Sequence, residues 1–120
     1  MPDMKTYTGG CHCGRFRYEV DTELAQVIEC NCSHCHKKGL VLTFVTPDAF
    51  RLMKGDESEL AIYQFNRKRI HHAFCPTCGV ESFAWGTTKD GNTNYSINVR
   101  CLDDVELDSL AITAFSGKDF

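Results

Sequence analysis

Seven of the eight cysteines in this chain fall into three tight clusters. The clusters are Cys11-His-Cys13, Cys30-Asn-Cys32-Ser-His-Cys35 and Cys75-Pro-Thr-Cys78. Four thiolates suit a closed tetrahedral zinc site, whereas three thiolates leave one coordination position open for water or a substrate. The spacing therefore predicts two zinc ions per chain, one structural and one capable of chemistry.

Disulfides and iron–sulfur clusters are the competing explanations for so many cysteines. The first ten residues contain no apolar segment typical of a secretory signal, so we predict a cytoplasmic location, where disulfides are rare. The usual C-x2-C-x2-C run of iron–sulfur proteins is absent. In a reducing compartment, C-x-C and C-x-x-C spacings favour metal binding.

Length and charge limit the domain organisation and the partners. The chain has 120 residues, and its three clusters must converge in space, which predicts one domain over residues 1–120. The net charge of −3 gives no basic surface suited to nucleic acid. No run approaches the roughly 18 apolar residues of a membrane span, so we expect no membrane partner. The oligomeric state is not constrained.

Periodicity predicts a mainly β chain. Residues 15–20 alternate between polar and apolar side chains, as a half-buried strand does. Residues 41–45, 60–65, 81–85 and 95–99 are rich in β-branched and aromatic residues and also predict strands. Short helical turns are expected at residues 33–38 and 103–110. No window has a long helical period.

Two of the cysteine pairs predict the structural site. Cys75 and Cys78 frame a tight turn, and Gly79 would provide the positive φ that follows the second sulfur. Cys11 and Cys13 would project to the same side if they lie on an extended strand. Together the two pairs supply the four thiolates of a closed site.

The remaining three cysteines allow two interpretations. Cys30 and Cys32 repeat the C-x-C spacing, and a helical turn would bring Cys35 back to the same metal. One interpretation is a second structural site, completed by Cys101, His34 or His36. The other is an open zinc that takes a thiol substrate as its fourth ligand and holds it as the nucleophilic thiolate.

The clusters and their flanking residues resemble the glutathione-dependent formaldehyde-activating enzyme family, which includes centromere protein V. The matching segments are Gly9-Gly-Cys11-His-Cys13-Gly14, Cys30-Asn-Cys32-Ser-His-Cys35 with Gly39, Tyr63, His72-Ala-Phe-Cys75-Pro-Thr-Cys78-Gly79 and Asn98-Val-Arg-Cys101-Leu-Asp103. The resemblance implies a tent-like all-β zinc domain with two small antiparallel sheets. It implies that Cys11, Cys13, Cys75 and Cys78 hold the structural zinc, and that Cys30, Cys32 and Cys35 hold the catalytic one.

The resemblance also implies a reaction. It is the condensation of glutathione, or a similar thiol, with formaldehyde or another small aldehyde, formally a carbon–sulfur lyase activity. His34 and His36 are local candidates for the acid that protonates the product, and Lys37-Lys38 and Arg67-Lys-Arg69 are candidate cations for the glutathione carboxylates. The alternatives are a thiol carrier without catalysis and a zinc-stabilised interaction module. For Cys101 we expect a small buried side chain.

Overall fold

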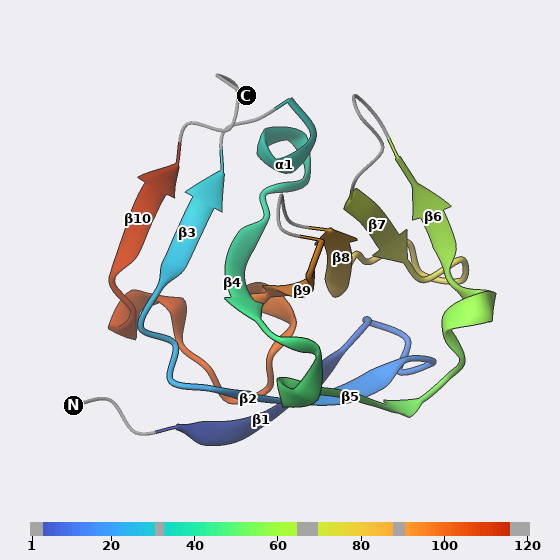
Figure 1. The fold of residues 1–120 in the computed structure, drawn as a ribbon, viewed down its shortest axis with the longest axis horizontal. Helices are drawn as coiled ribbons and strands as arrows, with labels where there is room; N and C mark the ends of the chain where they lie inside the picture. Colours follow the sequence, from blue (N-terminus) through green and yellow to red (C-terminus); the bar gives the residue numbers. More distant parts are fainter. Residues whose placement is uncertain (1–3, 31–32, 65–69, 88–90, 116–120) are drawn as a thin grey trace.

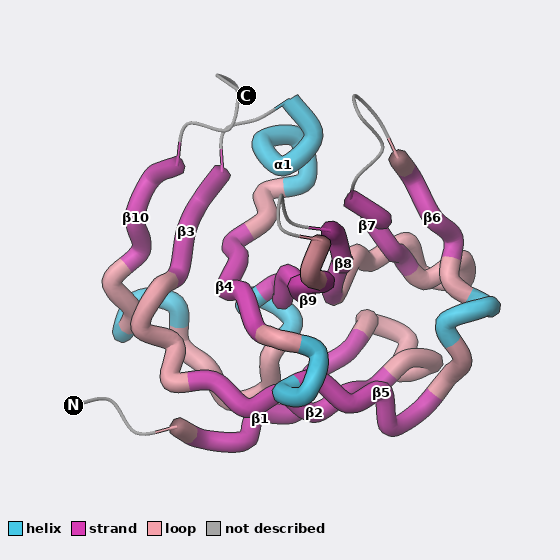
Figure 2. The backbone as a smooth tube through the Cα atoms, viewed as in Figure 1, coloured by secondary structure: helices cyan, strands magenta, loops and turns pink. Residues whose placement is uncertain are grey.

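Strands account for most of the regular structure of the protein. The computed structural model describes residues 4–30, 33–64, 70–87 and 91–115. Figures 1 and 2 show the strands as the main framework, with short helical segments between them. The strands are β1 (Lys5–Gly10), β2 (Arg17–Thr22), β3 (Val27–Cys30), β4 (Val41–Val45), β5 (Phe50–Lys54), β6 (Ala61–Tyr63), β7 (Ile70–Phe74), β8 (Phe83–Thr87), β9 (Thr93–Asn98) and β10 (Ile112–Phe115).

The helical segments in the described residues are short. The α-helix is α1 (Ser33–Lys38), and the 3-10 helices are η1 (Pro47–Ala49), η2 (Glu57–Glu59), η3 (Val99–Cys101) and η4 (Leu107–Ser109). The prediction of a helical turn at residues 33–38 is therefore confirmed. At residues 103–110 the structure has the turn η4 over three of the expected residues.

The strands form two sheets that face each other. The first, sheet A, has the order β1-β2-β5 and is antiparallel. The second, sheet B, has the order β10-β3-β4-β9-β8-β7-β6. In Figure 1 sheet A lies across the bottom and sheet B curves above it, with α1 at the top. The mainly β fold with two sheets is as the sequence predicts.

One pairing departs from the expected antiparallel sheets. β10 runs parallel to β3, with Ile112 opposite Val27. Parallel neighbours need a long crossover connection, and here the chain from β4 to β9 supplies it, since these strands lie between β3 and β10 in the sequence. Sheet B is also larger than the small sheet expected, because residues 27–30, 70–74 and 112–115 add strands that the periodicity did not indicate.

The hydrophobic core lies between the two sheets. Tyr18 of β2 is 1% exposed and packs edge-on against Phe83 of β8, with ring centroids 5.7 Å apart. Phe50 of β5 contacts both rings, at 5.3 Å from Tyr18 and 4.7 Å from Phe83. The Tyr18 hydroxyl donates to the Ser82 carbonyl at 3.1 Å, so the polar end of the buried ring has a partner. This contact fixes the distance between the sheets close to the cysteine loops.

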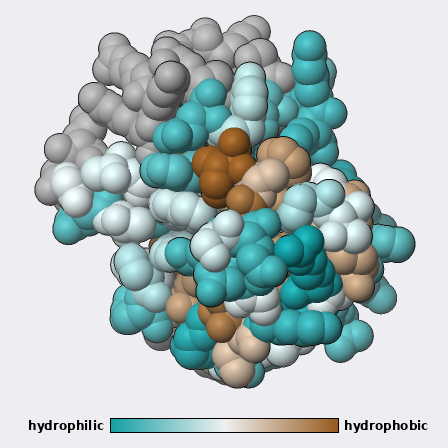
Figure 3. Space-filling view, turned by 90° about the vertical axis from the view of Figure 1, so that its right-hand side faces the viewer, coloured by the Kyte–Doolittle hydropathy of each residue, from teal (hydrophilic) through white to brown (hydrophobic). Residues whose placement is uncertain are grey.

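The β6 edge of sheet B carries a small apolar surface. Ile62 and Tyr63 of β6 and Ile70 of β7 are each at least 41% exposed. Figure 3 views this side of the molecule, where hydrophobic side chains form a limited group with hydrophilic ones around it. β6 has only three residues, and such a short edge strand offers little backbone for pairing with another chain.

Candidate metal centre

Cys11 and Cys13 lie in the loop that joins β1 to β2. The expectation that they occupy an extended strand is wrong, because β1 ends at Gly10 and the chain then turns. The Cys11 N–H donates to the Phe16 carbonyl at 3.2 Å, and the Phe16 N–H donates to the Cys11 sulfur at 3.4 Å. These two bonds close the loop, and Gly14, at φ 80°, provides its left-handed residue. The two sulfurs converge because the loop curls.

Cys75 and Cys78 lie in the turn between β7 and β8. The Gly79 N–H donates to the Cys75 carbonyl at 2.8 Å, and Gly79 has φ 81°, as the sequence predicts. The N–H groups of Thr77 and Cys78 point at the Cys75 sulfur, at 3.4 and 3.5 Å. Backbone donors aimed at a sulfur stabilise its thiolate form. The turn is therefore built to present anionic sulfur.

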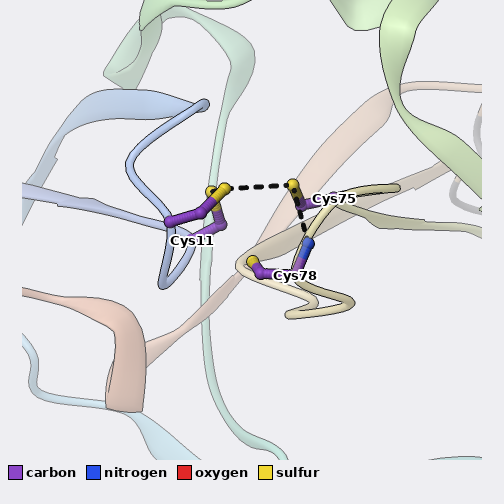
Figure 4. A group of neighbouring side chains, drawn as sticks. Cys11, Cys75 and Cys78 are labelled. Carbon is purple, nitrogen blue, oxygen red and sulfur yellow. Dashed lines mark hydrogen bonds between the residues drawn. The ribbon is translucent and has the colours of Figure 1, made fainter.

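The two loops bring four sulfurs together from opposite sheets. The Cys13 sulfur lies 3.7 Å from that of Cys11 and 3.6 Å from that of Cys75. All four ligand atoms lie within 4.8 Å of one another. Figure 4 shows Cys11 on one loop facing Cys75 and Cys78 on the other. The cluster could hold a metal ion.

The geometry and chemistry of this donor set fit zinc. Sulfurs bound at about 2.3 Å in a tetrahedron would lie about 3.8 Å apart, close to the observed separations. A disulfide would need about 2.05 Å, so neither of these close pairs is one. Cys11 is 6% and Cys75 1% exposed, which shields two of the donors from water.

The thiols of the cluster differ in acidity. Burial raises the pKa of Cys78, but backbone N–H groups of Val80 and Cys13 outweigh it and lower the pKa to about 6. The pKa of Cys75 is also lowered, because backbone N–H donors outweigh its burial. A hydrogen bond from the Arg15 N–H lowers the pKa of Cys13. Burial and the neighbouring thiols together outweigh this bond and raise the pKa to about 11. A bound cation would favour the thiolate at every position.

Arg15 links the two cysteine loops at the surface. Its Nη1 donates to the Thr77 hydroxyl at 3.0 Å, and its Nη2 donates to Glu59 of η2, also at 3.0 Å. The guanidinium therefore joins the β1–β2 loop to the β7–β8 turn beside the sulfurs. Both charged groups are more than a third exposed, so the pair contributes little stability by itself.

The second predicted cluster lies where β3 leads into α1. Cys30 is the last residue of β3 and Cys35 lies within α1. Cys32 falls outside the described residues, as do the side chains of Cys30 and Cys35 and the cationic residues 67–69. The three-cysteine site stays a prediction. Lys37 and His36 on the same helix are exposed.

A buried polar cluster that the sequence did not indicate lies beside α1. The Glu81 carboxylate, 3% exposed, accepts from Lys38 Nζ at 3.0 Å and lies 3.2 Å from His72 Nδ1 and 3.5 Å from His34 Nε2. The His34 and His72 rings are 3.9 Å apart, and His34 also stacks on Tyr63 at 5.7 Å. In the sequence, Glu81 is only a charged residue at the start of an expected strand. Nothing in the pattern indicates that two histidines and a lysine surround it.

The acidities of this polar cluster follow from its burial and its charges. Burial raises the pKa of Glu81, but hydrogen bonds from His72 and Lys38 outweigh it and leave the pKa below its ordinary value. Burial lowers the pKa of His34, and the neighbouring His72 lowers it further. The side chain of His34, a candidate acid from the sequence, is 9% exposed and so is largely withdrawn from solvent.

Cys101, the last residue of η3, is half-buried and is not one of the four clustered sulfurs. Burial raises the pKa of its thiol to about 11, which keeps it protonated and unreactive near neutral pH. The side chain is less buried than was expected from the sequence.

A family comparison identifies the chain. The model of the family described as glutathione-dependent formaldehyde-activating enzyme matches residues 6–115. The chain belongs to this family. The match extends from β1 to β10, a range that contains all three cysteine clusters, and it confirms the resemblance to the glutathione-dependent formaldehyde-activating enzymes.

A solved structure supports the fold of this family member. The chain is similar to a crystal structure of a Rhodobacter sphaeroides protein, with 28% sequence identity and a TM-score of 0.77. The similarity covers 90% of this chain and 99% of the other. Within the described residues, no helix combines the length and apolar character needed to cross a membrane.

Proposed function

We propose that this protein condenses glutathione, or a similar thiol, with formaldehyde or another small aldehyde to give a hemithioacetal, which for glutathione and formaldehyde is S-hydroxymethylglutathione, formally a carbon–sulfur lyase activity. The observation that carries the proposal is the family match over residues 6–115. The four-sulfur cluster adds to it, because a separate metal centre that joins two loops leaves Cys30, Cys32 and Cys35 for chemistry.

Each cysteine group has its own role in this proposal. Cys11, Cys13, Cys75 and Cys78 hold a structural zinc, and their four thiolates leave no position for a substrate. Cys30, Cys32 and Cys35 hold a second zinc with one position open. When bound there, zinc lowers the pKa of a thiol in its coordination sphere and so favours the thiolate near neutral pH. The proposed site of action is the cytoplasm.

The reaction balances without an oxidant or a reductant. The glutathione thiol loses its proton, and its sulfur forms a bond to the aldehyde carbon. The π electrons of the carbonyl bond move to oxygen, and a proton is delivered there to give the hydroxyl group. Of the two candidate lysines at the end of α1, Lys38 is paired with Glu81, whereas Lys37 is exposed and provides positive charge near Cys35 in the chain, which suits a carboxylate of glutathione.

Adduct formation measured by NMR, with and without enzyme, tests the proposal. We expect wild-type protein to form the adduct faster than the spontaneous reaction, Cys35→Ser to abolish the excess rate, and Cys101→Ser, a matched control, to keep most of it. Progress curves that superimpose with and without enzyme would overturn the catalytic function. If calorimetry then still detects glutathione binding, a thiol carrier replaces the enzyme; if it does not, the zinc-stabilised interaction module remains.

A further inference from the structure

Glu81 lies between the structural cysteine turn and the helix of the three-cysteine segment. It follows Cys78 by three residues, just before β8 begins. Its carboxylate is 3% exposed, and its neighbours come from two other elements, α1 and β7. A carboxylate withdrawn from water this far is costly unless charged or hydrogen-bonding partners surround it. Its position therefore needs an explanation beyond the strand it precedes.

The backbone around Glu81 is held on both sides. On one side, the Cys75 N–H donates to the Val80 carbonyl at 3.1 Å, which ties the residue before Glu81 to the cysteine turn. On the other side, the Asn98 amide donates to the Glu81 carbonyl at 3.0 Å, and the Asn98 N–H donates to Ser82. Order in the cysteine turn is thus transmitted to Glu81 through a short, hydrogen-bonded segment.

The side chain of Glu81 reaches α1. Lys38 Nζ donates to Oε1 at 3.0 Å, and His34 Nε2 lies 3.5 Å from the same oxygen. These two residues flank Cys35 within the six-residue helix. A helix this short is unstable alone, so its position depends on tertiary contacts. Glu81 provides such contacts at both ends of the helix.

The same residues also have the composition of a metal site, since His34, His72 and Glu81 offer ligand atoms within 4.8 Å of one another. The Lys38 ammonium, however, already donates to Oε1 of this carboxylate and would repel a cation bound beside it. The ammonium also lies over the Phe74 ring, with Nζ 4.8 Å from the ring centroid, so it has a defined place. The cluster is better explained as a buried ion-pair network.

We propose that Glu81 is a positioning residue that fixes α1, and with it Cys35, relative to the structural cysteine turn. The inference rests on the proposed function, because the proposed function is what assigns Cys35 as a metal ligand. The physical reason is that, with Glu81 in place, the helix is ordered before the metal arrives. Without Glu81, part of the metal-binding free energy is used to order the helix, and the affinity of the second site falls.

A cobalt titration followed by thiolate charge-transfer absorption tests this inference. Protein loaded with one zinc ion at the four-cysteine centre receives cobalt as the second metal, and the affinity of that second equivalent is compared among variants. We expect Glu81→Ala to weaken it at least tenfold, and Glu81→Gln, which keeps the shape and one acceptor, to weaken it less. The matched control is Glu106→Ala, an exposed Glu at the start of η4.

Two further measurements separate positioning from general stability. Excess zinc should restore the adduct-forming rate of Glu81→Ala, because metal binding can still order the helix when its concentration is high. Lys38→Met combined with Glu81→Gln should weaken the second site by less than the product of the single effects, since both changes break one contact. Glu81→Gln and Lys38→Met carry the test if Glu81→Ala does not fold.

The outcomes distinguish this inference from the proposed function. If wild-type protein binds two metals and all Glu81 variants retain wild-type second-site affinity, the positioning role is overturned while the proposed function stands. If excess zinc fails to restore the rate although both sites fill, the positioning role is also overturned. If wild-type protein binds only one metal, the proposed function fails and this inference fails with it. Binding of a third metal that Lys38→Met strengthens would show that the cluster is a metal site instead.

Discussion

Arg51 of β5 lies between two carboxylates on the neighbouring strand β2. Its Nη2 and Nη1 donate to the two oxygens of Asp21 at 2.9 and 3.1 Å, and its Nε donates to Glu19 at 3.4 Å. The Thr6 hydroxyl also donates to Asp21, at 2.8 Å. Bonds from Arg51 first, and from Thr6 second, lower the pKa of Asp21 to about 2. The bidentate bond from Arg51 joins β5 to β2, and the Thr6 bond joins β1 to β2, so Asp21 connects all three strands of sheet A.

The Asp21 contact predicts a direction for acid denaturation. Because the folded pKa lies below the ordinary value of about 3.8, the contact stabilises the protein above that value. Its contribution is lost as the pH falls from about 3.8 toward 2. Carboxyl-detected NMR should find the low pKa in wild-type protein and a higher pKa, closer to 3.8, in Arg51→Met, in which the Thr6 bond to Asp21 remains. Arg100→Met should leave Asp21 unchanged, and a wild-type value near 3.8 would contradict the contact.

A second prediction at the residue scale concerns the cysteine ligands. Cys78→Ser leaves three thiolates around the proposed structural metal, and because such a metal contributes folding free energy directly, we expect a loss of several kcal/mol. Cys35→Ser should cost less, since its site is proposed to be open. Denaturant unfolding under reducing conditions measures both, with Cys101→Ser as the matched control. Equal losses for Cys78→Ser and Cys35→Ser would show that the two sites do not differ in this way.

At the scale of elements, local signals were predictable and distant partners were not. α1 and β4 match the predicted bounds, because both are set by residues that are neighbours in the chain. β7 was missed: its buried His72 interrupts the apolar pattern and is compensated by Glu81, nine residues away. β10 was missed because its pairing with β3 depends on the whole chain returning to the same edge.

The cysteine sites show the same division. The pairing of Cys11 and Cys13 with Cys75 and Cys78 was predictable from donor chemistry, because four thiolates complete a tetrahedral site. The loop conformation of the first pair was not, since it depends on the hydrogen bonds between Cys11 and Phe16. Nor was the polar cluster around Glu81, whose members are contributed by three separate segments.

Gly10 gives a prediction for the β1–β2 hairpin. A Cβ at this position would lie 2.1 Å from the Phe16 carbonyl oxygen, which accepts the hydrogen bond from Cys11. Gly10→Ala should therefore push the hairpin strands apart, lower stability by about 1–3 kcal/mol and weaken metal retention at the four-cysteine centre. Thermal unfolding and metal analysis measure the two effects.

The control for this prediction is Gly14→Ala in the same loop. Its added Cβ meets no atom within 4 Å, so the substitution carries only the cost of a positive φ, about 1–2 kcal/mol. We expect Gly14→Ala to keep its metal. If both variants lose metal equally, the close approach at Gly10 is not what holds Cys11 in place.

At the scale of the whole molecule, the four-cysteine centre joins the two sheets. Cys11 and Cys13 come from the hairpin of sheet A, and Cys75 and Cys78 come from a turn of sheet B. The contacts of Phe83 in sheet B with Tyr18 and Phe50 in sheet A join the same sheets through the core. A bound metal would therefore add a second attachment between the two sheets. In a chain of this length the hydrophobic core between them is of only moderate size.

If the chain holds the two zinc ions proposed above, this arrangement predicts that they leave in a fixed order. Purified protein should contain close to two zinc ions per chain by plasma emission spectroscopy under reducing conditions. A weak chelator should first remove the zinc proposed at Cys30, Cys32 and Cys35, with little change in circular dichroism, because that site is proposed to be open. A stronger chelator should then remove the zinc proposed at the four-cysteine centre, and unfolding should accompany this second step, because the attachment between the sheets is lost.

Absorbance of a metal indicator and circular dichroism, recorded on the same sample, follow the two steps. Release of both ions in one step together with unfolding would contradict distinct sites, and finding iron, or disulfides in place of metal, would contradict zinc at either.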